Sequence, residues 1–158
     1  MTYEVSRDVV DAFYSAYLSR DPHAIADMCD DDVEWCNAGP AEIMQFCGVW
    51  RGKQAIIERF ANLLPGIVRF KNLTMDSLLV DGDTSAMFGK LSCVHIATGR
   101  AICYRVAHLA RYRDGKLLSL RVLNDTLDAA EQYVGHPIPL TRETLVPQDE
   151  LQDDLIAL

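Results

Sequence analysis

The chain has 158 residues, of which 49% are apolar, 24% charged and 8% aromatic. This profile is typical of one globular domain that can bury a core without a disulfide or metal, and it excludes collagen, a coiled coil and full disorder. The formal net charge is −8 and no basic cluster offsets it, so we expect no nucleic-acid partner.

The N-terminal residues predict two helices. Ser6 can cap the first one, whose apolar face carries residues at three- and four-residue spacing: Val9, Val10, Phe13, Ala16 and Tyr17. Asp21 followed by Pro22 is a typical helix start, which predicts a second, short helix that runs to about Met28.

The acidic triplet Asp30-Asp31-Asp32 is expected to end that helix. We interpret it as a solvated connection, since runs of like charge are usually exposed, with a binding role such as a metal site as the alternative. Residues 33–37 predict a short strand, and residues 38–51 an irregular segment. Residues 53–64 predict a third helix with Ile56, Phe60 and Leu63 on one stripe, ended by Pro65-Gly66.

After residue 67 the apolar period changes from a helical one to two, which indicates strands. Four are expected, over residues 68–80, 84–97, 101–113 and 116–124, joined by turns at Asp81-Gly82-Asp83, Thr98-Gly99 and Asp114-Gly115. The apolar phase slips near Lys71-Asn72, which favours a bulge there. A short helix over residues 126–134 follows. Helices followed by consecutive strands predict an α+β fold with a curved antiparallel sheet.

The hairpin turn predicts which side chains face the interior. A two-residue turn at Thr98-Gly99 would pair Ala97 with Arg100, and cross-strand partners share a face. The less charged face should then be internal. It carries Met87, Gly89, Leu91, Cys93, His95, Ile102, Tyr104, Val106, His108 and Ala110. If Arg113-Asp114-Gly115 forms a three-residue loop with a glycine bulge, Leu120, Val122 and Asn124 join this face. A two-residue Asp-Gly turn would instead reverse the last strand.

An apolar internal face with a few converging polar groups predicts a small-molecule pocket. His108 is the candidate catalytic acid–base there, because an unperturbed imidazole titrates near pH ~6.5; the alternative is a core histidine bonded to a neighbour. The candidate ligand-binding residues are Phe13, Tyr17, Trp35, Asn37, Trp50, Cys93, His95, Tyr104 and Asn124. Each also has a plainer interpretation, as a core side chain, a pocket wall or a group that satisfies loop backbone.

Other motifs are missing from the sequence. The five cysteines are odd in number and show no C-x-x-C spacing, which favours a reducing cytoplasm over a disulfide framework. No secretory signal or long apolar run is visible, so neither export nor a membrane partner is expected. The histidines show no metal-ligand spacing and no dinucleotide fingerprint occurs, so we expect no metal and no cofactor.

Several phrases of the sequence resemble the SnoaL-like, ketosteroid isomerase-like branch of the nuclear transport factor 2-like superfamily. The resemblance covers about residues 6–134 and is specific for fold rather than for function. The phrases are Ala12-Phe13-Tyr14 with Asp21-Pro22-His23-Ala24-Ile25, Asp31-Asp32-Val33-Glu34-Trp35, Trp50-Arg51-Gly52-Lys53-Gln54-Ala55-Ile56 and Tyr112-Arg113-Asp114-Gly115-Lys116.

The resemblance implies a cone-shaped fold, with a curved sheet wrapped on the helices around an apolar pocket. The family includes ketosteroid isomerases, limonene epoxide hydrolases, scytalone dehydratases, polyketide cyclases and non-catalytic members, so fold does not give function. Ketosteroid isomerases use a tyrosine and two carboxyl groups of tuned pKa. By the resemblance, these three roles would fall on Phe13, Asn37 and His108 (or Ala107). None keeps the required group, so steroid isomerisation is not expected.

The limonene epoxide hydrolase set would fall on Leu91, Gly89 and Val122, which cannot open an epoxide by that arrangement. Two functions therefore stay open. The first is a cofactor-free isomerase, dehydratase or cyclase that acts on a small apolar oxygenated molecule through His108. The second is a non-catalytic small-molecule-binding or assembly module.

The resemblance also implies a homodimer formed through the outer face of the sheet, where Arg105, Arg111 and Arg121 are expected. We predict a single domain over residues 1–140. Residues 141–158 carry one arginine and five acidic residues, and they are expected to form an acidic tail or an arm on a partner subunit.

Overall fold

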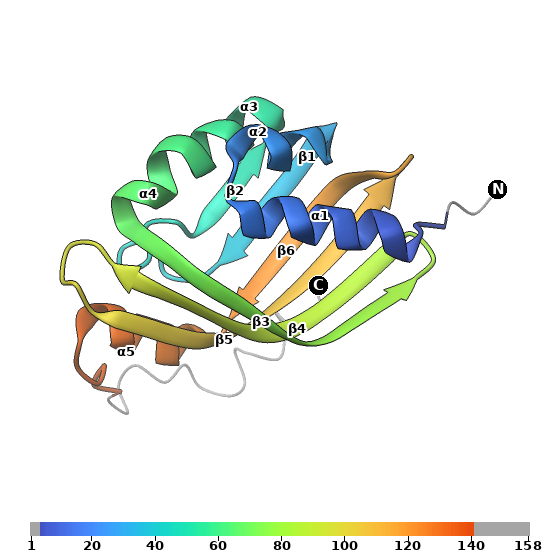
Figure 1. Ribbon diagram of the computed structural model, residues 1–158. Coiled ribbons are helices and arrows are strands. Elements are labelled where there is room, and N and C mark those ends of the chain that lie inside the picture. Colours follow the sequence, from blue (N-terminus) through green and yellow to red (C-terminus); the bar gives the residue numbers. More distant parts are fainter. Residues whose placement is uncertain (1–3, 141–158) are drawn as a thin grey trace, which may run out of the picture.

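The computed structural model describes residues 4–140. The helices of the N-terminal half pack on the concave face of a curved six-stranded sheet, whereas the last helix lies beside the fifth strand, away from that face (Figure 1). The helices are α1 (Arg7–Ser19), α2 (Pro22–Asp27), α3 (Lys53–Glu58), the π-helical η1 (Arg59–Leu63), α4 (Leu64–Ile67) and α5 (Thr126–Val134). The strands are β1 (Cys29–Ala38), β2 (Gly48–Arg51), β3 (Val68–Asp81), β4 (Thr84–His95), β5 (Ala101–Arg113) and β6 (Lys116–Asn124).

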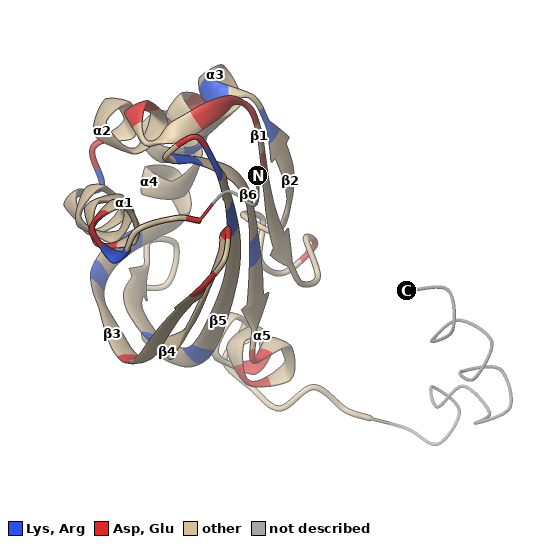
Figure 2. Ribbon diagram, turned by 90° about the vertical axis from the view of Figure 1, so that its right-hand side faces the viewer, with Lys and Arg blue, Asp and Glu red and all other residues tan. Residues whose placement is uncertain are grey.

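The first two helices begin where the sequence predicts. The side chain of Ser6 accepts a hydrogen bond from the Val9 amide, and that of Asp21 accepts from the amides of His23 and Ala24. These bonds satisfy amides that have no partner inside a helix. α1 ends at Arg20, which takes a left-handed conformation with φ 59°. Helix α1 lies across the concave side of the sheet (Figures 1 and 2).

The sheet has the order β2-β1-β6-β5-β4-β3. The predicted α+β class and the curved sheet are confirmed, but the sheet is mixed rather than wholly antiparallel. β1 pairs in parallel with β6, with Trp35 opposite Leu120, and β2 pairs antiparallel with β1. In this order β1 lies beside β6, so the four consecutive strands β3–β6 are extended by β1 and β2 into one larger sheet.

Two predictions about the segment before α3 were wrong. Residues 38–51 include a strand, β2, in which Trp50 pairs with Trp35 of β1. The acidic triplet lies within β1, which begins at Cys29, rather than in a connection. The short β2 escaped prediction because its four residues are partly or fully exposed and show no alternation.

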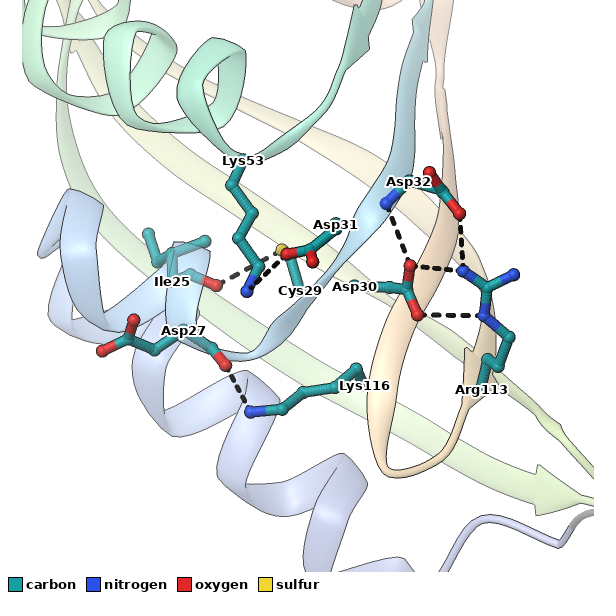
Figure 3. A network of polar contacts seen from close by, with 9 residues as sticks. All are labelled: Ile25, Asp27, Cys29, Asp30, Asp31, Asp32, Lys53, Arg113 and Lys116. Atoms are coloured by element: carbon teal, nitrogen blue, oxygen red, sulfur yellow. Dashed lines mark hydrogen bonds and ion pairs between the residues drawn. The ribbon is translucent and has the colours of Figure 1, made fainter.

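The acidic triplet pairs with basic side chains (Figure 3). Asp30 accepts two hydrogen bonds from Arg113, at 3.0 and 2.6 Å, and Asp32 accepts one at 2.7 Å. Asp31 lies 3.1 Å from the ammonium of Lys53. The hydrogen bonds from Arg113 hold the pKa of Asp30 below its usual range. These contacts join β1 to β5 and α3, and no group of three potential metal ligands occurs among residues 4–140.

The strand faces are as predicted, although both turns differ in detail. Val94 pairs with Ala101, so a longer loop replaces the two-residue one; an even change in loop length leaves the faces unaltered. Asp114-Gly115 forms a two-residue turn, with φ 50° and 75°. A register shift between Arg111 and Tyr112 restores the phase, and so Leu120, Val122 and Asn124 still share the face of His108.

The third helix continues beyond its predicted end. Its π-helical segment η1 is marked by the amide of Leu64, which bonds to the carbonyl of Arg59 five residues earlier. Pro65 follows this π-helical turn directly and is the second residue of α4, which runs on to Ile67. Pro65-Gly66 therefore does not stop the helix. The bulge predicted near Lys71-Asn72 is present as a register shift between Phe70 and Asn72.

The core lies between the concave face of the sheet and the helices. Its largest fully buried side chains include Trp35, Phe13, Met87, Leu117 and His108. On the opposite face of β4–β6, Arg105, Arg111 and Arg121 are exposed as predicted, beside exposed apolar side chains such as Phe88, Leu109 and Leu123. The described helices are all too short or too polar to cross a membrane.

Candidate functional site

A cavity lies between the end of α1, the helical segments η1 and α4, and the concave face of the sheet. The space between its lining atoms is about 480 Å³, its open end included, but the part wide enough for water is only about 40 Å³. The lining side chains come from helices, strands and one loop: Tyr17, Arg20, Trp35, Asn37, Phe46, Arg59, Phe60, Leu64, Val68, Phe70, Leu91, Cys93, Tyr104, Val122, Asn124 and Tyr133.

Aromatic rings form the wall on the helical side. Tyr17 stacks on Trp35 with centroids 5.9 Å apart, and Phe60 meets Trp35 edge-on at 5.3 Å. Tyr17 and Phe60 also meet edge-on, at 6.1 Å. Such offset and edge-on contacts hold rings in one orientation, so this wall is rigid and apolar.

Two asparagines supply amide groups, and each is already engaged. The indole nitrogen of Trp35 donates to the side-chain oxygen of Asn37 at 3.0 Å, which leaves the Asn37 amino group to other partners. The amino group of Asn124 donates to the Ala38 carbonyl at 2.9 Å, which leaves its oxygen. Their first role is thus to fix β1 and β6, and one polar group on each remains for a ligand.

Two phenols approach the cavity from β5 and α5. Burial raises the pKa of Tyr104 and of Tyr133 above the ordinary value, so both are neutral hydroxyls at physiological pH. The Tyr133 hydroxyl lies 3.6 Å from the sulfur of Cys93. Burial also raises the pKa of the Cys93 thiol, which makes a nucleophilic role for it unfavourable.

Arg59 is buried at the start of η1. Its side chain donates a 2.8 Å hydrogen bond to the Phe46 carbonyl, and its guanidinium lies 3.8 Å from the centre of the Trp50 ring. The Nε–H of Arg59 has no hydrogen-bond partner among the described residues. Burial, with the nearby charge of Arg20, lowers its pKa to about 10, so the group stays cationic at neutral pH.

Arg20 lies at the open end of the cavity. Its guanidinium carbon is 4.9, 4.7 and 4.5 Å from the ring centres of Tyr17, Phe60 and Phe70. The Nη1 atom is buried and has no hydrogen-bond partner in the described part of the chain. Aromatic faces, rather than a carboxylate, therefore hold this cation in place.

His108 lies deeper in the core and does not line the cavity. Its Nδ1 is 3.2 Å from the hydroxyl of Tyr14, and its ring meets Tyr17 edge-on at 5.7 Å. The Nε2 atom has no hydrogen-bond partner among residues 4–140. Burial lowers the pKa of His108 to about 3, so the imidazole is neutral at physiological pH.

Comparison with known proteins places this architecture in a family. The sequence profile of the SnoaL-like domain matches residues 10–120, most of the chain. The chain belongs to the SnoaL-like domain family. A search among curated proteins gives no significant match to this SnoaL-like protein.

Solved structures share the fold of this SnoaL-like protein. A candidate isomerase from Rhodopseudomonas palustris is 28% identical, with a TM-score of 0.69 over 80% of this chain and 93% of that one. A nuclear transport factor 2-like protein from Burkholderia thailandensis is 26% identical, with a TM-score of 0.69 over 79% and 94%. A candidate SnoaL-like polyketide cyclase from Mesorhizobium loti is 20% identical, with a TM-score of 0.58 over 73% and 95%.

The structure brings together part of the residue set predicted for the SnoaL-like pocket. Six of those side chains line the cavity: Tyr17, Trp35, Asn37, Cys93, Tyr104 and Asn124. Four lie elsewhere. Phe13 is fully buried beneath the wall, Trp50 lies behind Arg59, and His95 contacts Tyr133 and Thr98 outside the lining. His108 is the fourth.

Sequence reasoning missed both arginines of the cavity. Arg59 follows Ile56 by three residues and precedes Phe60, so it lies on the apolar stripe of its helix. A cation on such a stripe is the signal that could have revealed it. Arg20 gave no comparable signal, since it lies just after the last residue of α1 and adopts a left-handed conformation that is uncommon outside glycine.

Proposed function

We propose that this SnoaL-like protein binds a small, mainly apolar molecule that carries oxygen, in the cavity beside Tyr17 and Trp35. The observation that carries the proposal is the wall: rigid aromatic and aliphatic side chains surround a few polar groups that converge on one space. This combination is the usual form of a small-molecule site. The amino group of Asn37 is a neutral donor available to a ligand oxygen. The hydroxyls of Tyr104 and Tyr133, which bond to each other, supply further neutral polar groups beside it.

The cavity must widen to admit such a ligand. Its water-sized part is only about 40 Å³, far below the volume of a usual small-molecule pocket. Leu64, Val68 and Phe70 line both the cavity and a groove on the surface outside it. Displacement of these side chains is therefore the direct way in.

Catalysis by His108, as an isomerase, dehydratase or cyclase, is the second candidate function. The observation that favours it is the unpartnered Nε2 on an otherwise apolar internal face of the described chain. With a pKa of about 3, however, the imidazole is almost entirely neutral at pH 7, and it is a poor general acid and a weak base. Simple binding needs no such group, and so we place binding first.

A thermal-shift screen with steroids, terpenoids and aromatic polyketides tests the proposal. We expect at least one class to raise the melting temperature of the wild type but not of Leu91→Trp, in which a larger side chain fills the cavity. Leu127→Trp, at an exposed side chain of α5 outside the cavity lining, is the matched control and should behave as the wild type. Binding that survives Leu91→Trp would place the ligand elsewhere and overturn the proposal.

Mass spectrometry of the recovered ligand separates the two functions. A ligand returned intact supports binding alone. Conversion that stops in His108→Gln while binding persists would establish the catalytic candidate, and conversion that continues unchanged in that variant would remove His108 from it.

A further inference from the structure

The two arginines of the cavity are cations without an anion. Among the described residues, Asp and Glu are missing from the lining, and neither Arg20 nor Arg59 forms an ion pair. Each has one buried N–H group without a hydrogen-bond partner: Nη1 of Arg20 and Nε of Arg59. Of the three such side-chain nitrogens found in residues 4–140, two therefore belong to this one cavity.

An unpaired buried donor costs free energy, and a buried charge without a counter-ion costs more. Arg20 and Arg59 are also close enough to repel, since the charge of Arg20 disfavours that of Arg59. Proteins tolerate such arrangements chiefly at functional sites, where a ligand completes them. A cationic ligand would increase the repulsion between the two arginines, and a neutral ligand would not reduce it. An anionic ligand would reduce it.

The scaffold holds both guanidinium groups in position. Arg59 is fixed by the Phe46 carbonyl and by the face of Trp50, and it begins the π-helical turn η1; such turns often occur at functional sites. Arg20 is surrounded by three aromatic rings. In both arginines, N–H donors of the guanidinium group remain free to bind a planar anion.

We propose that the cavity binds the carboxylate of an aromatic acid, with the carboxylate between Arg20 and Arg59 and the ring against Tyr17, Trp35 and Phe60. This inference rests on the proposed function and makes it specific. The carboxylate accepts from Nη1 of Arg20 and Nε of Arg59 and neutralises part of their charge. Charge-assisted hydrogen bonds to a guanidinium are the strong ones, so the acid should bind well above its neutral analogue.

Calorimetric titration with matched pairs tests the proposal. The probes are benzoate and 2-naphthoate, each compared with its amide, in a buffer free of carboxylates. A hydrogen bond to a charged group contributes about 1.5–3 kcal/mol, so the wild type should prefer each acid by about tenfold or more. Arg20→Gln should reduce that preference to about twofold, with amide affinity nearly unchanged, and Arg20→Lys should restore part of it.

Arg121→Gln is the matched control, because it removes the same charge from the outer face of the sheet. It should leave the preference intact. Arg59→Gln is a second variant, read only where circular dichroism shows the native fold, and it too should reduce the preference. If the wild type binds amides or the wider neutral panel as tightly as the acids, this inference fails while the proposed function stands. If no compound of either set binds in the cavity, both fail.

Discussion

The hydroxyl of Tyr14 and Nδ1 of His108 lie 3.2 Å apart, with their rings nearly parallel at an interplanar angle of 12°. This contact joins α1 to β5 across the core. Because Nε2 of the same ring has no partner in the described residues, the Tyr14 hydroxyl supplies the hydrogen bond that compensates the buried imidazole.

The stability of the protein should depend on His108 at mildly acidic pH. The pKa of His108 is lowered from 6.5 to about 3 by burial, so between these values the unfolded state binds more protons than the folded one. The free energy of unfolding is therefore undiminished by this group above pH 6.5, and it decreases as the pH falls from 6.5 toward 3. Urea unfolding should show the wild type losing about 2 kcal/mol more than His108→Gln between about pH 7 and pH 5. Equal losses in the two proteins would contradict the buried, neutral imidazole.

The Tyr14–His108 hydrogen bond should be coupled rather than additive. Tyr14→Phe removes the hydroxyl and leaves both imidazole nitrogens without a partner, so we expect it to destabilise the fold by about 1–3 kcal/mol. In the His108→Leu background the same change should cost much less, since no buried nitrogen is then abandoned. A double-mutant cycle of unfolding free energies measures this, and additivity of the two changes would rule the coupling out.

Gly89 marks a close approach of β3 to β4. A Cβ atom at this position would meet the carbonyl oxygen of Thr74 well inside van der Waals contact, so the two strands would have to separate. We expect Gly89→Ala to destabilise the fold by about 1–3 kcal/mol, the usual cost of overpacking. Gly66→Ala is the control, because a Cβ there meets nothing within 4 Å and α4 should gain slightly from alanine. The prediction fails if both variants unfold at the wild-type temperature.

The outer face of the sheet is the surface that we propose for a homodimer. Phe88, Leu109 and Leu123 are 48%, 47% and 58% exposed on adjacent strands, and contiguous exposed apolar groups of this kind mark interaction surfaces. Sedimentation should give a dimer at micromolar concentration, which Leu109→Lys converts to a monomer. Leu127→Lys, at a side chain of α5 exposed to the same degree (46%), should remain dimeric. A wild-type protein that sediments as a monomer at this concentration would contradict the proposed homodimer.

The fold was largely predictable because local signals agreed with the final structure. The caps at Ser6 and Asp21, the change of period after residue 67 and the helix over Thr126–Val134 all appear as expected. The parallel pairing of β1 with β6 was not predictable in this way, because no local pattern specifies which distant strand a short strand joins. The described residues end at 140, so the predicted acidic segment of residues 141–158 lies outside them.

The site was less predictable than the fold, for two physical reasons. Strand parity correctly placed His108, Tyr104 and Asn124 on the internal face, but parity does not say whether a side chain meets a cavity or a neighbouring ring. His108 met Tyr14. Charge also misled, because arginine is usually exposed, whereas Arg59 is only 3% exposed. An arginine that packs against aromatic rings needs no acidic partner, so no pattern of paired charges in the sequence indicates its position.

The π-helical turn Arg59–Leu63 makes the shape of the cavity sensitive to chain length. Loss of one residue from this stretch would let an ordinary α-helix form, and the side chains on either side of the deletion would rotate by about 100° relative to each other. Arg59 and Leu64 could then no longer both reach the same space. Among relatives of this protein, single-residue insertions and deletions at this point should thus redirect ligand preference more abruptly than substitutions do.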